Sequence, residues 1–240
     1  MAHAAKAAIL PDKIPFTSGV VVPFALEAAV CALSLPTPGE AMPGVSTPAL
    51  ALPYPQLNAK PLGKSILVYG GSSAVGLATI QLAVASGLEV ITTASPHNFD
   101  LCKSCGASAV FDYKDPSLVD KVVEAFAGKG EFVGIIDAIS IADTYTHDLQ
   151  ILERLGGKHL ACTHPPPTDN IPAGVEAGMI FAVNDVAQPV WETFVTPALQ
   201  AGILKCLPEP LIVGTGLEYI QEAMQKNKAG VSAKKVVVEL

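Results

Sequence analysis

The chain has 240 residues, of which 50% are hydrophobic and only 15% are charged, and its formal net charge is −7. An acidic chain without a run of lysine or arginine is poorly suited to bind nucleic acid or an anionic membrane surface, so we expect a small-molecule substrate. The mean hydropathy of +0.43 predicts either an unusually apolar surface or a surface that a second subunit or another partner covers.

The longest apolar run, residues 19–35, contains Pro23 and Glu27 and falls short of the roughly 20 residues that span a bilayer. It lies too far from Met1, and without a basic segment before it, to resemble a signal peptide. We therefore expect a cytoplasmic protein with no membrane association. The five cysteines are an odd number in a chain rich in core-forming residues, which favours reduced thiols over disulfides.

Residues 1–61 are expected to contain one helix between two irregular segments. Residues 1–17 read as an extended segment with prolines that fix turns. Apolar residues recur at helical spacing over 18–35, which predicts a helix. Residues 36–61 carry seven prolines and predict an exposed connection without regular structure.

From residue 65 onward, apolar strands alternate with helices every 20 to 25 residues, which is typical of βαβ units and a parallel sheet. The pattern predicts a Rossmann-type α/β fold, with a doubly wound parallel sheet of six strands. The expected strands are 66–69, 89–93, 109–111, 132–137, 158–162 and 179–183. The expected helices are 74–86, 96–104, 117–126 and 142–155.

The last part of the chain predicts a second, smaller unit. We expect a helix over 186–201, a strand over 211–213, a helix over 217–226 and a terminal strand over 235–240. Because the six-stranded sheet is complete without it, the terminal strand is expected in a separate small sheet, to which residues 1–17 contribute.

A glycine-rich turn follows the first of the six strands. Residues 71–76 read Gly-Ser-Ser-Ala-Val-Gly, the G-x-G-x-x-G dinucleotide fingerprint with serine at the middle glycine. In this fingerprint the first glycine forms the turn, the last lets the helix pack closely, and backbone N–H groups of the helix start face a pyrophosphate. The predicted phosphate-binding residues are Gly70, Gly71, Ser72, Ser73, Ala74 and Val75, with the backbone N–H groups of Ser73, Ala74 and Val75 pointing at the phosphates.

The end of the second strand indicates which dinucleotide binds. An NAD site usually has an Asp or Glu there for the ribose hydroxyls, but no acidic residue stands between Glu89 and Asp100. The segment contains Ser95, His97 and Asn98 instead, which can donate to a 2′-phosphate without repelling it. This favours NADP, with Lys103 and Tyr113 as possible helpers. Alternatively, Ser95 only caps the next helix.

The ends of the fourth and fifth strands are expected at the nicotinamide half of the cofactor, because ligands of open parallel sheets bind beyond the carboxyl ends of the strands. The residues concerned are Ala138, Ile139, Leu160 and Ala161. Asp137, which precedes them, has the alternative role of capping a turn.

Two other motifs are disfavoured. Residues 70–74 approximate the nucleophile elbow of hydrolases, but that order needs a histidine late in the chain, and the last one is His164. Cys102 and Cys105 have C-x-x-C spacing but lack a second cysteine pair and a suitably spaced histidine, so helix-packing thiols are favoured over zinc. We expect no metal site.

The chain resembles the zinc-free members of the medium-chain dehydrogenase/reductase superfamily, and more closely the fungal trans-enoyl reductases and CipB-like oxidoreductases. The segments that carry this resemblance are 70–76, 95–101, 106–107, 110–116, 214–220 and 231–237. It implies that Ser95, His97 and Asn98 lie near the adenosine 2′-phosphate and that Tyr113 lies beside the adenine.

The resemblance also implies a domain organisation and a function. Such enzymes usually carry a GroES-like catalytic domain, of which residues 1–61 and 206–240 would be remnants flanking a dinucleotide-binding domain over 62–205. The implied function is NADPH-dependent hydride transfer to an activated C=C bond, as in an enone or enoyl group, or to a carbonyl or quinone. The alternative is a catalytically incomplete NADPH-binding protein that acts as a sensor, subunit or remnant. No catalytic residue is assigned.

Overall fold

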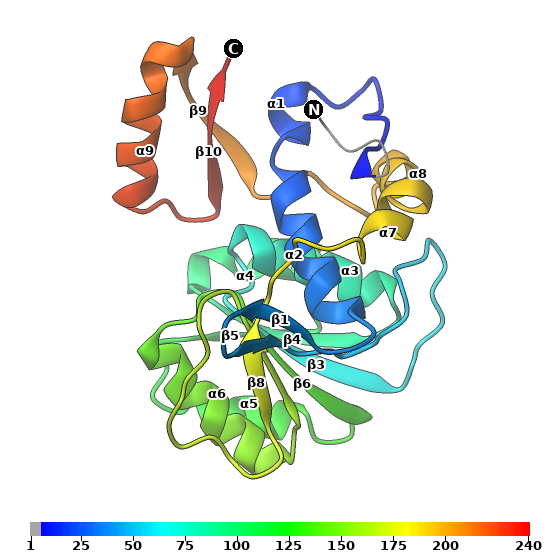
Figure 1. The fold of residues 1–240 in the computed structure, drawn as a ribbon, viewed down its shortest axis with the longest axis vertical. Coiled ribbons are helices and arrows are strands. Elements are labelled where there is room, and N and C mark those ends of the chain that lie inside the picture. The colour runs from blue at the N-terminus through cyan, green and yellow to red at the C-terminus, as the bar shows by residue number, and fades with distance from the viewer. Residues whose placement is uncertain (1–5) are drawn as a thin grey trace.

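The computed structural model describes residues 6–240 and is built around a six-stranded parallel sheet (Figure 1). The strand order is β5-β4-β3-β6-β7-β8, and every neighbouring pair is parallel. This order reverses direction between β3 and β6, as in a doubly wound fold, which confirms the predicted fold class. The strands are β3 (Lys64–Tyr69), β4 (Glu89–Ala94), β5 (Ala109–Asp112), β6 (Glu131–Asp137), β7 (His159–Cys162) and β8 (Glu176–Met179).

Helices cover both faces of this sheet and enclose two apolar cores. One core lies among α2, α3 and α4, and the other lies under α5 and α6. Because the strands are covered on both faces, their residues are buried in continuous runs, as in β3, where 65–69 are all buried. The helices are α2 (Val22–Ser34), α3 (Ala74–Ala85), α4 (Phe99–Ser104, after the 3₁₀ turn η2, Pro96–Asn98), α5 (Leu118–Ala125) and α6 (Ala142–Leu155).

The proline-rich connection contains a short hairpin that the sequence reading missed. Strands β1 (Gly39–Met42) and β2 (Val45–Thr47) pair antiparallel, and β2 packs against β8 at the edge of the large sheet. Gly178 allows this contact, since a Cβ there would lie 2.3 Å from the carbonyl oxygen of Ser46. The hairpin therefore depends on a packing partner more than 130 residues away, which local proline content does not reveal.

The C-terminal part forms the separate small unit that was expected. Its strands β9 (Glu209–Thr215) and β10 (Lys234–Glu239) pair only with each other among the described residues, and they do so in parallel. Residues 6–17 contain the start of α1 (Phe16–Gly19) and no strand, so their expected contribution to this sheet is wrong for that range. Residues 1–5 lie outside the described part. The other elements are α7 (Gln188–Thr193), α8 (Val195–Ala201), η3 (Leu217–Tyr219) and α9 (Ile220–Lys228).

The sixth strand is displaced from its expected position. The apolar run 179–183 predicts a strand there, whereas β8 spans Glu176–Met179. His159 pairs with Glu176 and Cys162 with Met179, so β8 ends level with β7. The register with β7 thus decides the position of β8, and the apolar residues after it form the loop toward α7.

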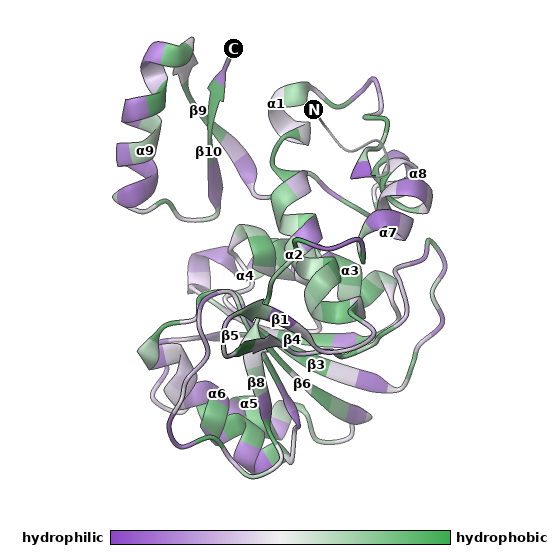
Figure 2. Ribbon diagram, in the orientation of Figure 1, coloured by the Kyte–Doolittle hydropathy of each residue, from purple (hydrophilic) through white to green (hydrophobic). Residues whose placement is uncertain are grey.

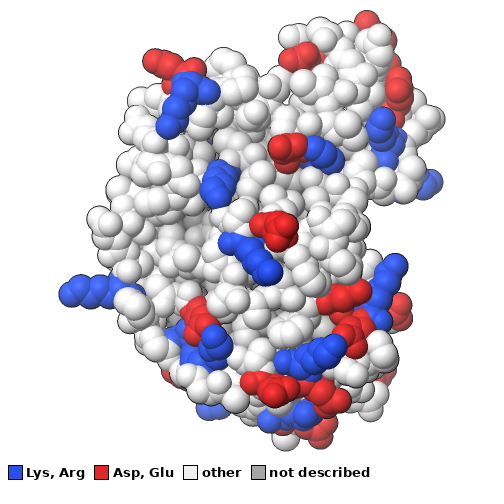
Figure 3. Space-filling view, turned by 180° about the vertical axis from the view of Figure 1, so that it is seen from behind, with Lys and Arg blue, Asp and Glu red and all other residues white. Residues whose placement is uncertain are grey.

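The N-terminal helix α2 is a core element. By length and composition alone the stretch Phe16–Ser34 could cross a membrane, yet 56% of its most apolar window is buried. Figure 2 shows it as one of the most hydrophobic parts of the ribbon, next to α3, on which it packs. Figure 3 shows charged side chains concentrated at one end of the molecule and broad uncharged surface elsewhere. Part of the apolar surface comes from the N-terminal helices, where Phe16 and Phe24 are 85% and 74% exposed.

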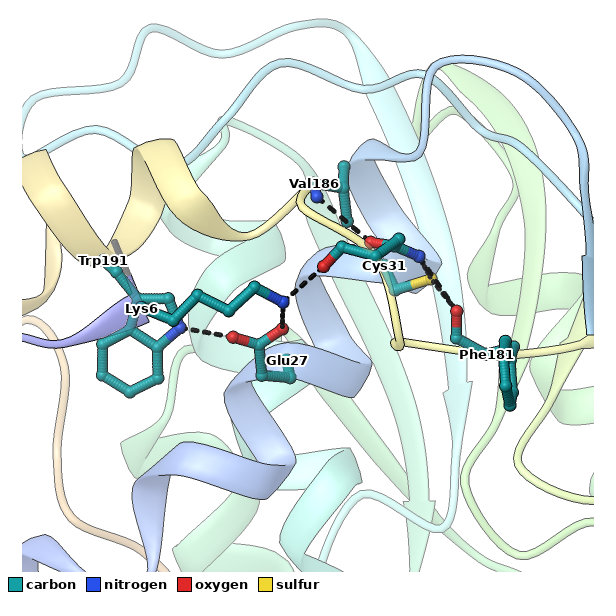
Figure 4. Close-up of polar contacts among 7 residues, drawn as sticks. Lys6, Glu27, Cys31, Phe181, Val186 and Trp191 are labelled. Atoms are coloured by element: carbon teal, nitrogen blue, oxygen red, sulfur yellow. Dashed lines mark hydrogen bonds and ion pairs between the residues drawn. The ribbon is translucent and has the colours of Figure 1, made fainter. Parts of the chain in front are cut away.

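Polar contacts tie α2 to the segment between β8 and α7 (Figure 4). Glu27 of α2 forms an ion pair with Lys6 at 3.1 Å and accepts a hydrogen bond from the indole N–H of Trp191 at 2.5 Å. Asn184 donates to the carbonyl of Phe181 at 2.9 Å and to the sulfur of Cys31 at 3.6 Å. Segments far apart in the sequence are thereby held together beside the carboxyl end of β8.

Asp148 of α6 is the least favourably placed charge-bearing group of the described fold. It is fully buried, and neither carboxylate oxygen has a hydrogen-bond partner among the described residues. Burial, and secondarily the nearby charge of Asp137, raise the pKa of Asp148 well above its usual value. A raised folded-state pKa means that this group stabilises the fold at low pH and that its contribution is lost as the pH rises.

We therefore predict that Asp148→Asn stabilises the protein at neutral pH by about 1 to 3 kcal/mol, because the amide needs no ionisation penalty. Urea unfolding should show a larger gain near pH 7.5 than near pH 5. Asp143→Asn, at an exposed position of the same helix, should change the free energy of unfolding by less than about 0.5 kcal/mol. A gain at Asp148 that is equal at both pH values would contradict the assignment.

Candidate functional site

The glycine turn between β3 and α3 brings three backbone segments very close together. Gly70 has φ of 77°, and a Cβ there would lie 2.4 Å from the Ile139 side chain. Gly76, in the first turn of α3, packs against the same turn, since its Cβ would lie 2.3 Å from the carbonyl oxygen of Gly70. Both positions therefore require glycine: a side chain at Gly70 would overlap Ile139, and one at Gly76 would overlap the backbone of Gly70.

Ser73 caps α3, which corrects one detail of the expected phosphate site. Its backbone N–H donates to the carbonyl of Gly70 at 3.0 Å and is not free for a phosphate. Its hydroxyl oxygen accepts the N–H of Gly76 at 3.0 Å, which leaves the hydroxyl proton available to a ligand. The N–H groups of Ala74 and Val75 lie in the first helical turn, where the helix supplies no acceptor, so they remain suited to an anion.

A cleft of about 1130 Å³ opens at this turn. A notch between the small C-terminal unit (β9, α9 and β10) and the rest of the molecule is visible at the right-hand edge of Figure 3. The cleft collects eight of the residues that the sequence reading assigned to the cofactor: Gly70, Ser72, Ser73, Ser95, His97, Asn98, Tyr113 and Ile139. Segments from β3, β4, β5 and β6 thus meet in one hollow, as their shared carboxyl edge requires.

The other predicted residues do not line the cleft. Gly71 is buried, and a Cβ there would overlap the hydroxyl of Thr92. Leu160 and Ala161 are completely buried within β7. Ala74, Val75 and Ala138 are half-buried beside the turns. Ile139, expected at the nicotinamide half, lines the cleft together with Ser95 and Tyr113.

The end of β4 presents hydroxyl and amide groups to the cleft. Ser95 precedes the 3₁₀ turn η2, but its side chain makes no capping hydrogen bond, so its hydroxyl is free for a ligand. Ser232, from the loop before β10, lies 3.0 Å from Nε2 of His97, and Asn98 donates to its hydroxyl oxygen at 3.2 Å. The loop 230–233 therefore closes one side of the cleft.

The sequence reading missed several residues that line the cleft, among them Ser232 and Lys114. Ser232 was signalled only by its place in the family-like tail 231–237, because nothing local links it to β4. Lys114 lines the cleft, with its ammonium 5.7 Å from the centre of the Tyr113 ring. Lys103, named as a possible helper, does not line it. Lys114 is thus the one lysine or arginine among the residues that line the cleft.

Asp137 holds the wall of the cleft opposite β4. One of its carboxylate oxygens accepts the backbone N–H groups of Ile139 at 2.8 Å and Ser140 at 2.9 Å, and the other accepts the hydroxyl of Thr144. Asp137 is fully buried and its carboxylate satisfies a turn, which agrees with its alternative role as a cap. The turn directs Ile139 over Gly70.

Residues 6–240 contain no group of three or more His, Cys, Asp or Glu side chains that could hold a metal ion. Cys102 and Cys105 are buried, and burial raises the pKa of Cys102 to about 12, so this thiol stays protonated. His159 is buried in β7, and burial lowers its pKa to about 4. These groups pack in the core and face no open site.

With this geometry established, comparison with known proteins identifies the family. The model of the zinc-binding dehydrogenase family matches residues 74–178. Dehydrogenase orsE of Emericella nidulans is 64% identical over 238 residues, which cover 98% of this chain and 68% of the relative. The chain belongs to the zinc-binding dehydrogenase family. The chain is also 38% identical to trans-enoyl reductase himH of Aspergillus japonicus, over 96% of the chain and 64% of that protein.

These matches confirm the resemblance to fungal members of the medium-chain superfamily. The chain spans about two thirds of the length of these relatives. Among solved structures, mycobacterial Rv1454c complexed with NADPH superposes with a TM-score of 0.65 at 21% identity, over all of this chain and 70% of that one. At this identity the superposition supports the Rossmann-type fold.

We predict that Gly76→Ala destabilises the protein by about 1 to 3 kcal/mol, because the added methyl meets backbone atoms that cannot rotate away. Alanine's helical advantage, about 1 kcal/mol, would act in the opposite direction. Urea unfolding measures the net effect. Gly39→Ala is the matched control, since its Cβ would meet nothing closer than 3.9 Å. Equal stability of the Gly76→Ala variant and the wild type would contradict the close approach.

Proposed function

We propose that this chain binds NADPH in the cleft and belongs to an oxidoreductase that transfers hydride to an activated C=C bond or to a carbonyl or quinone. The observation that carries the proposal is the cleft itself, which joins the glycine turn and Ser73, the N-cap of α3, to the polar end of β4. The printed names of relatives support the reaction class, since they include a dehydrogenase and a trans-enoyl reductase.

The residues of the cleft fit a dinucleotide. The free N–H groups at the start of α3 and the hydroxyl of Ser73 suit the pyrophosphate. Ser95, His97, Asn98 and Ser232 supply donors at the end of β4, where a ribose is held in this fold. A bound NADPH would supply the hydride from C4 of its nicotinamide, while the protein orients the cofactor and excludes water.

The choice of NADP over NAD rests on charge. Among the residues that line the cleft, the one carboxylate is that of Asp143, which belongs to α6 and not to the segment 94–98 at the end of β4. Ser95, His97 and Asn98 supply donors at that end, and Lys114 lies on the same cleft. A 2′-phosphate there would gain hydrogen bonds without facing a carboxylate.

We expect NADPH to bind at least about tenfold more tightly than NADH, as followed by enhancement of the reduced nicotinamide fluorescence. Ser95→Asp should weaken NADPH binding about tenfold or more through repulsion of the 2′-phosphate, and change NADH binding only a few-fold. Ser104→Asp, on the exposed end of α4, is the control and should have no effect. Equal affinity for the two cofactors would contradict the NADP assignment, and no binding of either would contradict the site.

Turnover separates the reductase from a protein that only binds NADPH. NADPH oxidation at 340 nm should be followed with an enone, a quinone and a 2-enoyl thioester as acceptors. Oxidation with any of them supports the reductase. Tight NADPH binding without oxidation of NADPH would favour the binding protein.

A further inference from the structure

One wall of the cleft combines apolar side chains with two polar side chains of α6. From this arrangement we infer that Asp143 and His147 recognise the Watson–Crick edge of the adenine base and so select an adenine dinucleotide. The inference rests on the proposed function, because it requires a dinucleotide in the cleft.

The place of the base follows from the order of groups along the cofactor. The pyrophosphate belongs at the turn before α3, and the adenosine ribose at the end of β4. The base is attached to that ribose and must lie in the same cleft. Tyr113, Ile139 and Ile141 line the cleft and are 39%, 36% and 51% exposed, so their apolar surfaces are available to the faces of a flat ring.

Asp143 and His147 line the same cleft from the first two turns of α6. They are four residues apart on α6, which places them on the same face one turn apart, and both line the cleft. Asp143 is exposed, and its carboxylate makes no hydrogen bond or ion pair with another residue of the described range 6–240. It is therefore free to accept hydrogen bonds from a ligand.

Tyr69 fixes the orientation of His147. Its hydroxyl lies 2.9 Å from Nδ1 of His147, and the two rings are stacked with their planes 17° apart. Tyr69 is only 3% exposed, and burial raises its pKa, so the phenol keeps its proton. If that proton is donated to Nδ1, the neutral imidazole carries its hydrogen on Nε2, which becomes a donor.

This pair of groups complements adenine. The edge of adenine presents a 6-amino donor beside the N1 acceptor, and the protein presents a carboxylate acceptor beside an imidazole donor. Hypoxanthine has the opposite pattern, with an oxygen acceptor at position 6 and an N–H donor at N1. The same two side chains would therefore reject hypoxanthine, since a carboxylate would face a carbonyl oxygen and two N–H groups would face each other.

A purely structural role makes a different prediction. An acidic residue in the first turn of a helix is favourable with the helix dipole, and His147 packs on Tyr69 whether or not a base is present. Neither role depends on which base the ligand carries. The ratio of affinities for two bases therefore separates recognition from packing.

The test compares NADPH with its hypoxanthine analogue, reduced nicotinamide hypoxanthine dinucleotide phosphate, by fluorescence titration of the full chain. The wild type should bind NADPH about tenfold more tightly than the analogue. Asp143→Asn, whose amide can donate to the oxygen, and His147→Phe, which keeps a ring against Tyr69, should each bring this ratio close to one. Tyr69→Phe should reduce the ratio in part, since it releases the imidazole tautomer.

Glu153→Gln is the control, an exposed acid on α6 outside the cleft, and should leave the ratio unchanged. Thermal unfolding shows whether each variant is folded. A wild type that binds both dinucleotides equally overturns the inference while leaving the proposed function intact, as does a ratio that survives both Asp143→Asn and His147→Phe. Failure of the wild type to bind either dinucleotide overturns both.

Discussion

The close packing of Gly76 against Gly70 is the constraint on which the rest of the site depends. It brings the N-terminus of α3 directly onto the turn after β3, so the N–H groups of the first helical turn face the open edge of the sheet. At the same turn Ile139 occupies the space that a Cβ of Gly70 would need. Two glycines therefore fix the relative positions of α3, β3 and the loop after β6.

The loop after β6 is held by a buried carboxylate whose hydrogen bonds are satisfied. Asp137 accepts two backbone N–H groups and one hydroxyl, and Ser140, which has a positive φ of 56°, accepts the backbone N–H of Thr163 at 2.8 Å. This network links β6 to β7 and sets the cleft wall. Asp148 shows the contrast, since it is equally buried but has no such donors among the described residues, and its pKa rises accordingly.

The sequence predicts the architecture of the large sheet well because its information is local. Helix α6 spans the expected 142–155, and the start of α3 at Ala74 follows from the glycine turn. The features that were missed depend on partners distant in sequence. The hairpin β1–β2 needs β8, and β8 itself takes its position from β7. Contacts of this kind leave no periodic pattern in the segment concerned.

The same distinction applies to the site. Ser95, His97 and Asn98 follow from the absence of acids after β4, whereas Lys114 and Ser232 join them only through the fold. The hydrogen bonds of Ser73 could not be predicted from the motif either. That its hydroxyl oxygen accepts the backbone N–H of Gly76 is known only from the structure. Which segments approach a motif is a tertiary property.

The loop 230–233 connects the cofactor cleft to the small C-terminal sheet. Ser232 contacts His97 and Asn98, and Lys235 at the start of β10 lies 5.5 Å from the centre of the Phe24 ring on α2. A ligand that contacts both the end of β4 and this loop would interact with the large-sheet domain and the small C-terminal sheet at once. Because such a ligand would bind only the arrangement in which the two are together, its binding free energy would also stabilise that arrangement. Through Ser232, a ligand in the cleft would thus also influence the position of the small sheet.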